Sequence, residues 1–176
     1  MKKLKLDNKK LFVALGSAIL VVIILFGVYN YFYVSAFSRN VVVQEDIDLE
    51  KYMGTWYDVY SIPVRFQDGL TNVTATYTLK DNGKVIVYNK GYEDGELKDI
   101  TGTARVIGDG RFKVSFFPLI WSDYNVLFTD YEFAVVGGGR PNYFWVLSRT
   151  PEISDEKLAE FLLLGEEQGY KVVRNG

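Results

Sequence analysis

The chain has 176 residues and a formal net charge of −2, and it contains neither cysteine nor histidine. The absence of cysteine excludes disulfides, thiol nucleophiles, thiolate metal sites and an acylated lipoprotein cysteine, and the absence of histidine excludes imidazole zinc sites and Ser-His or Cys-His catalysis. After residue 40 there are 14 basic and 21 acidic residues, a balance of −7, so this part has no electrostatic reason to bind nucleic acid or an anionic membrane surface.

The first 36 residues have the pattern of a membrane anchor. Residues 1–10 contain five lysines, and the 28 positions 11–38 contain no charged residue. A helix needs about 20 predominantly apolar residues to cross a bilayer, so we predict a transmembrane signal-anchor over 11–36, with the basic N-terminus in the cytoplasm. The following domain would face outward, as in a single-pass protein of the inner or plasma membrane. The alternative is a cleaved signal ending at Val34-Ser35-Ala36, which would leave a secreted or periplasmic protein.

The remaining chain predicts a short tether and then an all-β domain. The tether covers 37–48, and the domain covers 49–176, with Asp48 placed to cap one helical turn over 49–52. Val, Ile, Thr, Tyr and Phe then dominate, and Asn-Gly, Asp-Gly and Gly-Gly pairs recur at short intervals, as in consecutive hairpins. We predict eight antiparallel strands in an up-and-down barrel, over 55–62, 72–79, 84–90, 98–106, 111–117, 124–129, 132–136 and 143–149.

The longer connections and the C-terminal part are predicted from breakers and caps. Pro118 marks a loop over 117–123, and a glycine-rich loop covers 137–142. Pro151 ends the last strand, Ser154 is suited to cap a C-terminal helix, and Gly169 is suited to end it. This helix should pack on the outside of the barrel, and 170–173 should add a short final strand.

Alternation along the strands predicts which side chains face the interior. The clearest case is the second strand, where Val73, Ala75 and Tyr77 alternate with threonines. An eight-stranded barrel is just wide enough to hold one small ligand, and Gly102 and Ala104 leave space inside it. The predicted lining consists of Val73, Ala75, Tyr77, Val85, Val87, Asn89, Ile100, Gly102, Ala104, Phe112, Val114, Phe116, Tyr124, Val126, Tyr143 and Trp145. A solid aromatic core is the open alternative.

Three short motifs lie far apart in the chain: Gly54-Thr55-Trp56-Tyr57, Thr129-Asp130-Tyr131 and Arg149. A tryptophan that begins the first strand can meet an arginine that ends the last only if the sheet closes, and this contact contributes roughly 0.5–2 kcal/mol. By these motifs, in this order, the chain resembles the lipocalins, and within them the bacterial lipocalins close to apolipoprotein D. The resemblance covers about 49–173. It implies structural roles for Gly54, Trp56, Tyr57, Thr129, Asp130, Tyr131 and Arg149.

The resemblance also implies a function. We expect a binding protein and not an enzyme, without metal or cofactor, whose calyx takes a fatty acid or lysophospholipid for lipid storage, scavenging or transfer in the cell envelope. The first loop of lipocalins covers the open mouth, which places Arg65 and Phe66 there. Phenol groups in the lining and Asn89 could bind a ligand headgroup. Asp58 has inward parity and would be costly to bury alone, which favours a hydrogen-bond network around it.

Two other functions remain open. An envelope protein-interaction module with a filled barrel would present Ile86, Tyr88, Phe117 and Ile120 on its outer surface. An enzyme acting on a lipophilic substrate is less favoured, because the chain lacks cysteine, histidine and a Gly-x-Ser-x-Gly nucleophile elbow. The natural ligand and the oligomeric state are not determined by the sequence.

Overall fold

The structure, a computed structural model, describes residues 8–63, 67 and 69–173. The chain forms two compact units, Met1–Ala36 and Phe37–Gly176. Arg65 and Phe66, the expected mouth-loop residues, lie outside the described residues.

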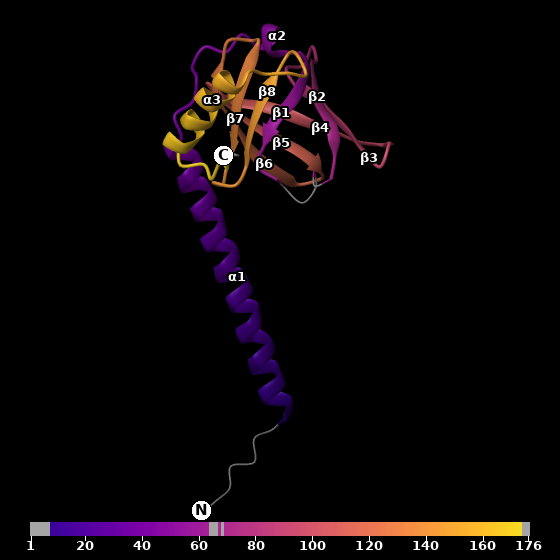
Figure 1. Ribbon diagram of the computed structural model, residues 1–176. Helices are drawn as coiled ribbons and strands as arrows, with labels where there is room; N and C mark the ends of the chain where they lie inside the picture. Colours follow the sequence, from indigo (N-terminus) through magenta and orange to yellow (C-terminus); the bar gives the residue numbers. More distant parts are fainter. Residues whose placement is uncertain (1–7, 64–66, 68, 174–176) are drawn as a thin grey trace, which may run out of the picture. The chain divides into compact units, whose positions relative to one another are not determined.

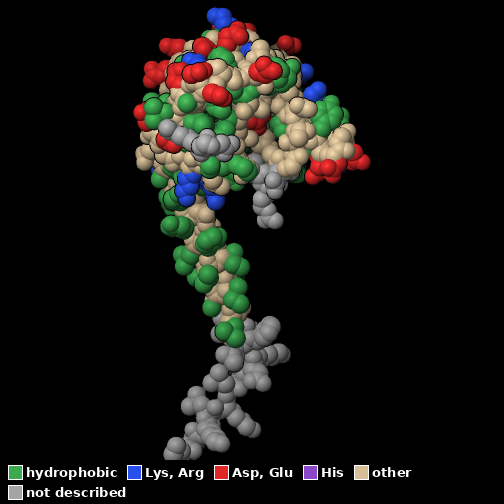
Figure 2. Space-filling model, viewed as in Figure 1, with side chains coloured by type: hydrophobic (Ala, Val, Ile, Leu, Met, Phe, Trp, Pro, Cys, Tyr) green, Lys and Arg blue, Asp and Glu red, His purple; other side chains and the backbone are tan. Residues whose placement is uncertain are grey.

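The N-terminal helix α1 (Asn8–Asn40) has the length and composition of a membrane span. Its segment Leu15–Asn40 has 26 residues and a mean hydropathy of 2.1 in its most apolar window. At 1.5 Å per residue this segment is about 39 Å long, which exceeds the roughly 30 Å of a hydrocarbon core. Its apolar side chains are exposed along the helix, as the green surface of α1 in Figure 2 shows. A helix that is apolar on all sides is stable in lipid and not in water.

The second unit is a closed barrel in which every strand pairs with its neighbours in sequence. Closure comes from antiparallel pairing of the first strand with the last, for example Tyr57 with Ser148. The predicted eight-stranded up-and-down barrel is therefore confirmed (Figure 1). The strands are β1 (Gly54–Ser61), β2 (Thr71–Leu79), β3 (Val85–Glu93), β4 (Glu96–Gly108), β5 (Arg111–Phe117), β6 (Ile120–Thr129), β7 (Phe133–Gly138) and β8 (Phe144–Ser148).

The antiparallel order gives the barrel two distinct ends. The β1–β2, β3–β4, β5–β6 and β7–β8 connections lie at one end, which we call the mouth end. The short helix α2 (Leu49–Tyr52) precedes β1 at the opposite end, which we call the closed end (Figure 1). Asp48 caps α2 as predicted, accepting a hydrogen bond from the Lys51 amide.

Two details of the predicted fold are wrong. The expected loop over 117–123 is a tight hairpin, because β6 begins at Ile120 and continues the ladder through pairs such as Lys113 with Asp123. The breaker Pro118 ends β5 without lengthening the connection. The expected strand over 170–173 is absent. This segment is held instead by the buried side chain of Tyr170, by a bond from the Lys171 amide to the Pro141 carbonyl, and by bonds between the Val173 backbone and the Tyr60 hydroxyl.

The C-terminal helix α3 (Asp155–Glu167) lies on the outside of the barrel beside β7 and β8 (Figure 1). Ser154 is its N-cap, as predicted. Phe161 and Leu162 are buried against Val135, Phe144 and other outward-facing strand residues, in a core separate from the barrel interior. The domain thus has two hydrophobic clusters, one inside the barrel and one beneath α3.

The segment 37–48, expected as a tether, lies against the outer wall of the barrel. At the mouth end the Phe37 ring meets Tyr170 edge to face, with ring centroids 5.2 Å apart. Arg111 donates to the carbonyls of Ser38 and Val41. At the closed end the Asp48 amide donates to the Tyr131 hydroxyl. These contacts hold the segment along the barrel from one end to the other.

Candidate functional site

The closed end is sealed by Arg149 and Trp56, as the motifs predict. The guanidinium lies 3.7 Å from the centre of the fully buried indole ring. It also donates to the carbonyls of Lys51, Thr55, Met53 and Tyr131 at 2.7–3.1 Å. Gly54 has a φ of +93°, and a Cβ there would lie 3.3 Å from the guanidinium, so the glycine permits both the turn and the close approach.

The motif Thr129-Asp130-Tyr131 shapes the neighbouring turn. Asp130 accepts hydrogen bonds from the amides of Glu132 and Phe133. Thr129 donates to the Phe133 carbonyl and accepts from the Tyr131 amide, which holds Tyr131 at a φ of 70°. These hydrogen bonds fix the turn between β6 and β7 at the closed end.

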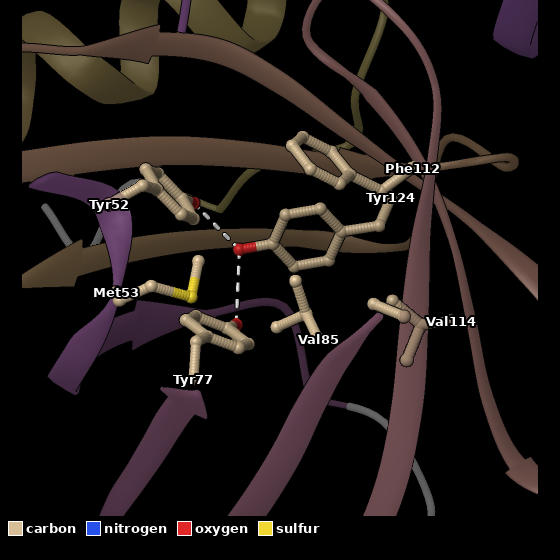
Figure 3. A pocket seen from close by; sticks show the side chains of 8 residues that line it. Tyr52, Met53, Tyr77, Val85, Phe112, Val114 and Tyr124 are labelled. Atoms are coloured by element: carbon tan, nitrogen blue, oxygen red, sulfur yellow. Dashed lines mark hydrogen bonds between the residues drawn. The ribbon is translucent and has the colours of Figure 1, made fainter. Parts of the chain in front are cut away.

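Three tyrosines form a hydrogen-bonded floor inside the barrel (Figure 3). The Tyr124 hydroxyl lies 2.7 Å from that of Tyr52 and 3.1 Å from that of Tyr77. Burial raises the pKa of Tyr77 to about 12, and it raises the pKa values of Tyr52 and Tyr124 well above the usual range. The hydroxyls remain neutral and bond to one another, so Tyr77 and Tyr124 are committed to the floor and are not the free headgroup donors that the sequence suggested.

The sequence assigned Tyr52 to a helical turn before the first strand and gave it no role in the interior. Its side chain enters the closed end and donates or accepts a bond with Tyr124, 72 residues further along the chain. The ring also stacks on Tyr77 and Phe112. The only sequence signal was its position two residues before the Gly54 motif, where α2 leads into the barrel.

The lower half of the interior is almost completely packed. Its cavity has a volume of about 20 Å³ and is lined by Tyr52, Met53, Tyr77, Val85, Ala104, Phe112, Val114 and Tyr124 (Figure 3). This is room for about one water molecule. The space expected over Gly102 is filled by Phe116, because a Cβ on Gly102 would lie 2.7 Å from the Phe116 ring. Gly102 thus accommodates Phe116 and provides no ligand space.

Along one inward-facing row, side chains become less buried from β1 to β4. Strand pairing places Trp56, Ala75, Asn89 and Ile100 in one inward-facing row across β1 to β4. Trp56 is fully buried, Ala75 and Asn89 are partly exposed, and Ile100 is 38% exposed. Ile100 lies on the part of β4 beyond its pairing with β5, which begins at Thr103. Val73, Phe116, Tyr143 and Trp145 are also only partly buried.

Two polar features lie in this part of the interior. The Asn89 Oδ1 atom is buried and has no hydrogen-bond partner among the described residues, which is costly unless water or a ligand binds there. Trp145 stacks parallel to Tyr143, with ring centroids 6.2 Å apart, and its indole donates to Gln67. This part of the interior therefore combines aromatic side chains with one buried acceptor that has no partner among the described residues.

Asp58 is the one acidic group of the predicted inward set. It lies two residues from Trp56 on β1 and pairs with Leu147, which belongs to the interior cluster. Burial raises its pKa to about 6, and a hydrogen bond from the Ser61 side chain opposes this rise. No broader hydrogen-bond network around Asp58 is found in the described part of the chain, so its carboxyl is protonated in part near neutral pH.

Residues 47–174 match the family model of the lipocalin-like domain. The chain belongs to the lipocalin family. Outer membrane lipoprotein Blc of Citrobacter freundii is 42% identical to this lipocalin over 141 residues, which cover 76% of this chain and 80% of the relative. Mouse apolipoprotein D is 34% identical over 129 residues, covering 66% and 68%. The resemblance to bacterial lipocalins and apolipoprotein D is thereby confirmed.

The fold agrees with solved lipocalin structures. Insecticyanin from the tobacco hornworm Manduca sexta superposes with a TM-score of 0.62, covering 74% of this chain and 79% of the other at 20% sequence identity. At this identity the likeness extends to the fold alone.

Proposed function

We propose that this lipocalin binds one elongated apolar ligand, a fatty acid or a lysophospholipid, in the mouth half of its calyx. The observation that carries the proposal is the row of inward-facing side chains, Ala75, Asn89 and Ile100, that stay accessible above a packed floor. A barrel with a solid core would bury them. A ligand tail would cover them and gain about 0.8 kcal/mol for each methylene removed from water, before the costs of association.

The charge inside the barrel favours entry of the ligand tail first. Asp58 is inward-facing and partly ionised near neutral pH, so a carboxylate or phosphate placed beside it would be repelled. The floor tyrosines use their hydroxyls on one another and offer little to a headgroup. The headgroup would therefore remain at the mouth, and the tail would lie along the apolar wall between Trp145 and Ile100.

The biological role follows from this cargo and from the N-terminal helix. Helix α1 has the length and hydropathy of a membrane anchor, and the Blc relative from Citrobacter freundii is named as an outer membrane lipoprotein. Because this sequence contains no cysteine, α1 would replace a lipid-modified cysteine as the anchor. We infer a membrane-tethered, non-enzymatic carrier that stores, scavenges or transfers lipids in the cell envelope.

A filled barrel that acts through its outer surface is the second candidate. The cavity of about 20 Å³ in the lower half and the exposed side chains of Phe117 and Ile120 favour it. This candidate predicts no ligand in the calyx.

Ligand binding separates the two functions. Native mass spectrometry of the purified protein should find one lipid per chain, and a fluorescent fatty acid should be displaced by lysophospholipid. Ala75→Trp places an indole in the mouth half and should abolish uptake. Thr78→Trp is the matched control, because Thr78 lies on the same strand but faces outward and is exposed. Absence of bound lipid and of probe binding in the unmodified chain would instead support the filled barrel.

A further inference from the structure

The β5–β6 hairpin presents an exposed apolar tip at the mouth end. Leu119 is 95% exposed, Ile120 63%, Phe117 61% and Trp121 40%, and no charged residue occurs from 117 to 122. Single exposed apolar residues are ordinary on protein surfaces, but a contiguous exposed patch indicates an interaction site. We call Phe117, Leu119, Ile120 and Trp121 the hairpin tip.

The backbone of the hairpin tip indicates that the side chains there are not present for folding. Leu119 has a φ of 67°, in the left-handed region where glycine or asparagine is usual. A leucine at this position carries backbone strain and almost completely exposes its side chain. Neither the turn nor the core benefits from it, so an external contact is the remaining physical reason for an apolar side chain.

The polar groups behind the hairpin tip have the arrangement of a membrane interface. The Arg105 guanidinium lies 4.4 Å from the centre of the Trp121 ring, and Lys113 pairs with Asp123 on the neighbouring rungs. In proteins at a bilayer surface, apolar side chains contact the acyl chains, indole rings lie at the interface, and cations contact the headgroup phosphates. The hairpin tip, Trp121 and Arg105 follow this order. A groove of about 350 Å³ runs beside the tip and is lined by Ile86, Thr101, Gly102, Thr103, Ser115, Phe116, Phe117, Pro118, Leu119 and Trp121.

The barrel unit is joined to the N-terminal segment at this same end. Its first residue, Phe37, packs on Tyr170, and Tyr170 donates to the carbonyl of Gly138 in the β7–β8 connection. All three residues belong to the barrel unit, so Phe37 is placed at the mouth end by contacts within this unit. Phe37 is the first residue of the barrel unit, and the apolar segment Leu15–Asn40 enters the unit there.

We propose that the hairpin tip inserts into the lipid bilayer and holds the mouth of the barrel against the membrane surface. The occupant is a lipid surface, because the tip is apolar and uncharged, and because Phe37, where the apolar segment enters the barrel unit, also lies at the mouth end. The attraction is hydrophobic, so it does not depend on anionic lipids, which the acidic domain would not attract. The proposal concerns the outer surface and holds whether or not the calyx binds a ligand.

The full chain in phosphatidylcholine nanodiscs tests this directly, because single cysteines can be placed in a chain that has none. Leu119→Cys carries an environment-sensitive NBD fluorophore at the hairpin tip. Asp81→Cys, in the β2–β3 turn, is the control at the closed end, and Leu163→Cys is an exposed apolar control on α3. We expect blue-shifted emission and quenching by spin-labelled acyl chains at position 119 only, and Ile120→Asp in that labelled chain should reduce the quenching about tenfold.

Water-like emission at position 119, equal to that at position 81, would overturn the proposal. So would a blue shift that increases with the number of chains per nanodisc, because it would assign the tip to a second copy. All labelled positions are exposed, and thermal unfolding followed by circular dichroism verifies that each variant is folded. Lipid extraction from the same samples reports calyx loading separately, so failure of ligand binding and failure of insertion give different results.

Discussion

Replacement of Arg149 by methionine tests the closure of the barrel most directly. Methionine retains much of the apolar volume but removes the cation over Trp56 and the bonds to the carbonyls of Lys51, Met53, Thr55 and Tyr131. Water can reach these partly exposed carbonyls, so we count only one charged hydrogen bond, about 1.5–3 kcal/mol, and the cation–π contact, about 0.5–2 kcal/mol. The expected loss in the free energy of unfolding is about 2–5 kcal/mol.

Urea unfolding of the segment 37–176, which holds all eight strands and both hydrophobic clusters, measures this loss. With a denaturant slope of about 1–3 kcal/mol per molar, the midpoint should fall by roughly 1–2 M. Arg149→Lys is the control, since it keeps the charge but cannot donate to four carbonyls. Its urea midpoint should lie between those of the unmodified chain and of Arg149→Met. An unchanged midpoint for Arg149→Met would refute the view that this contact closes the barrel.

Three further predictions concern the interior. Burial raises the pKa of Asp58 in the folded chain to about 6, from an ordinary value of 3.8, so the free energy of unfolding should decrease as pH rises from about 4 to 6 and then level off. Urea titrations at several pH values should find this decrease absent in Asp58→Asn. Gly102→Val should lower the melting temperature, because its side chain would collide with Phe116, whereas Thr103→Val on the outer face should not. Tyr124→Phe should cost about 1–3 kcal/mol in urea unfolding, because two buried hydroxyls lose their partner, and an unchanged midpoint would contradict the hydrogen-bonded floor.

The charge of Asp58 gives the binding proposal a pH dependence as well. Deprotonation above pH 6 places a negative charge inside the calyx, so a fatty acid should bind more weakly at pH 8 than at pH 5. The difference in affinity between the two pH values should be smaller in Asp58→Asn. A zwitterionic lysophospholipid with its headgroup at the mouth should show a smaller change. Fluorescent-probe displacement at the two pH values distinguishes these ligands.

The sequence by itself determined the barrel, its strand order and the seal at its closed end. Hairpin connections are local, alternation has a period of two, and the Trp56 and Arg149 positions require the ends of the sheet to meet, so each feature can be read without knowing what packs on it. The same local signals marked the cap of α2 at Asp48 and the cap of α3 at Ser154.

Only the tertiary structure decided how much of the interior is empty. Alternation states which way a side chain points, but not which neighbour occupies the space in front of it. Phe116 covers Gly102, and Tyr52 enters from α2 to bond Tyr124, a contact between positions 72 residues apart. Both contacts join residues that are distant in sequence or on different strands. They fill the part of the interior next to the closed end, which alternation alone predicted to be a cavity.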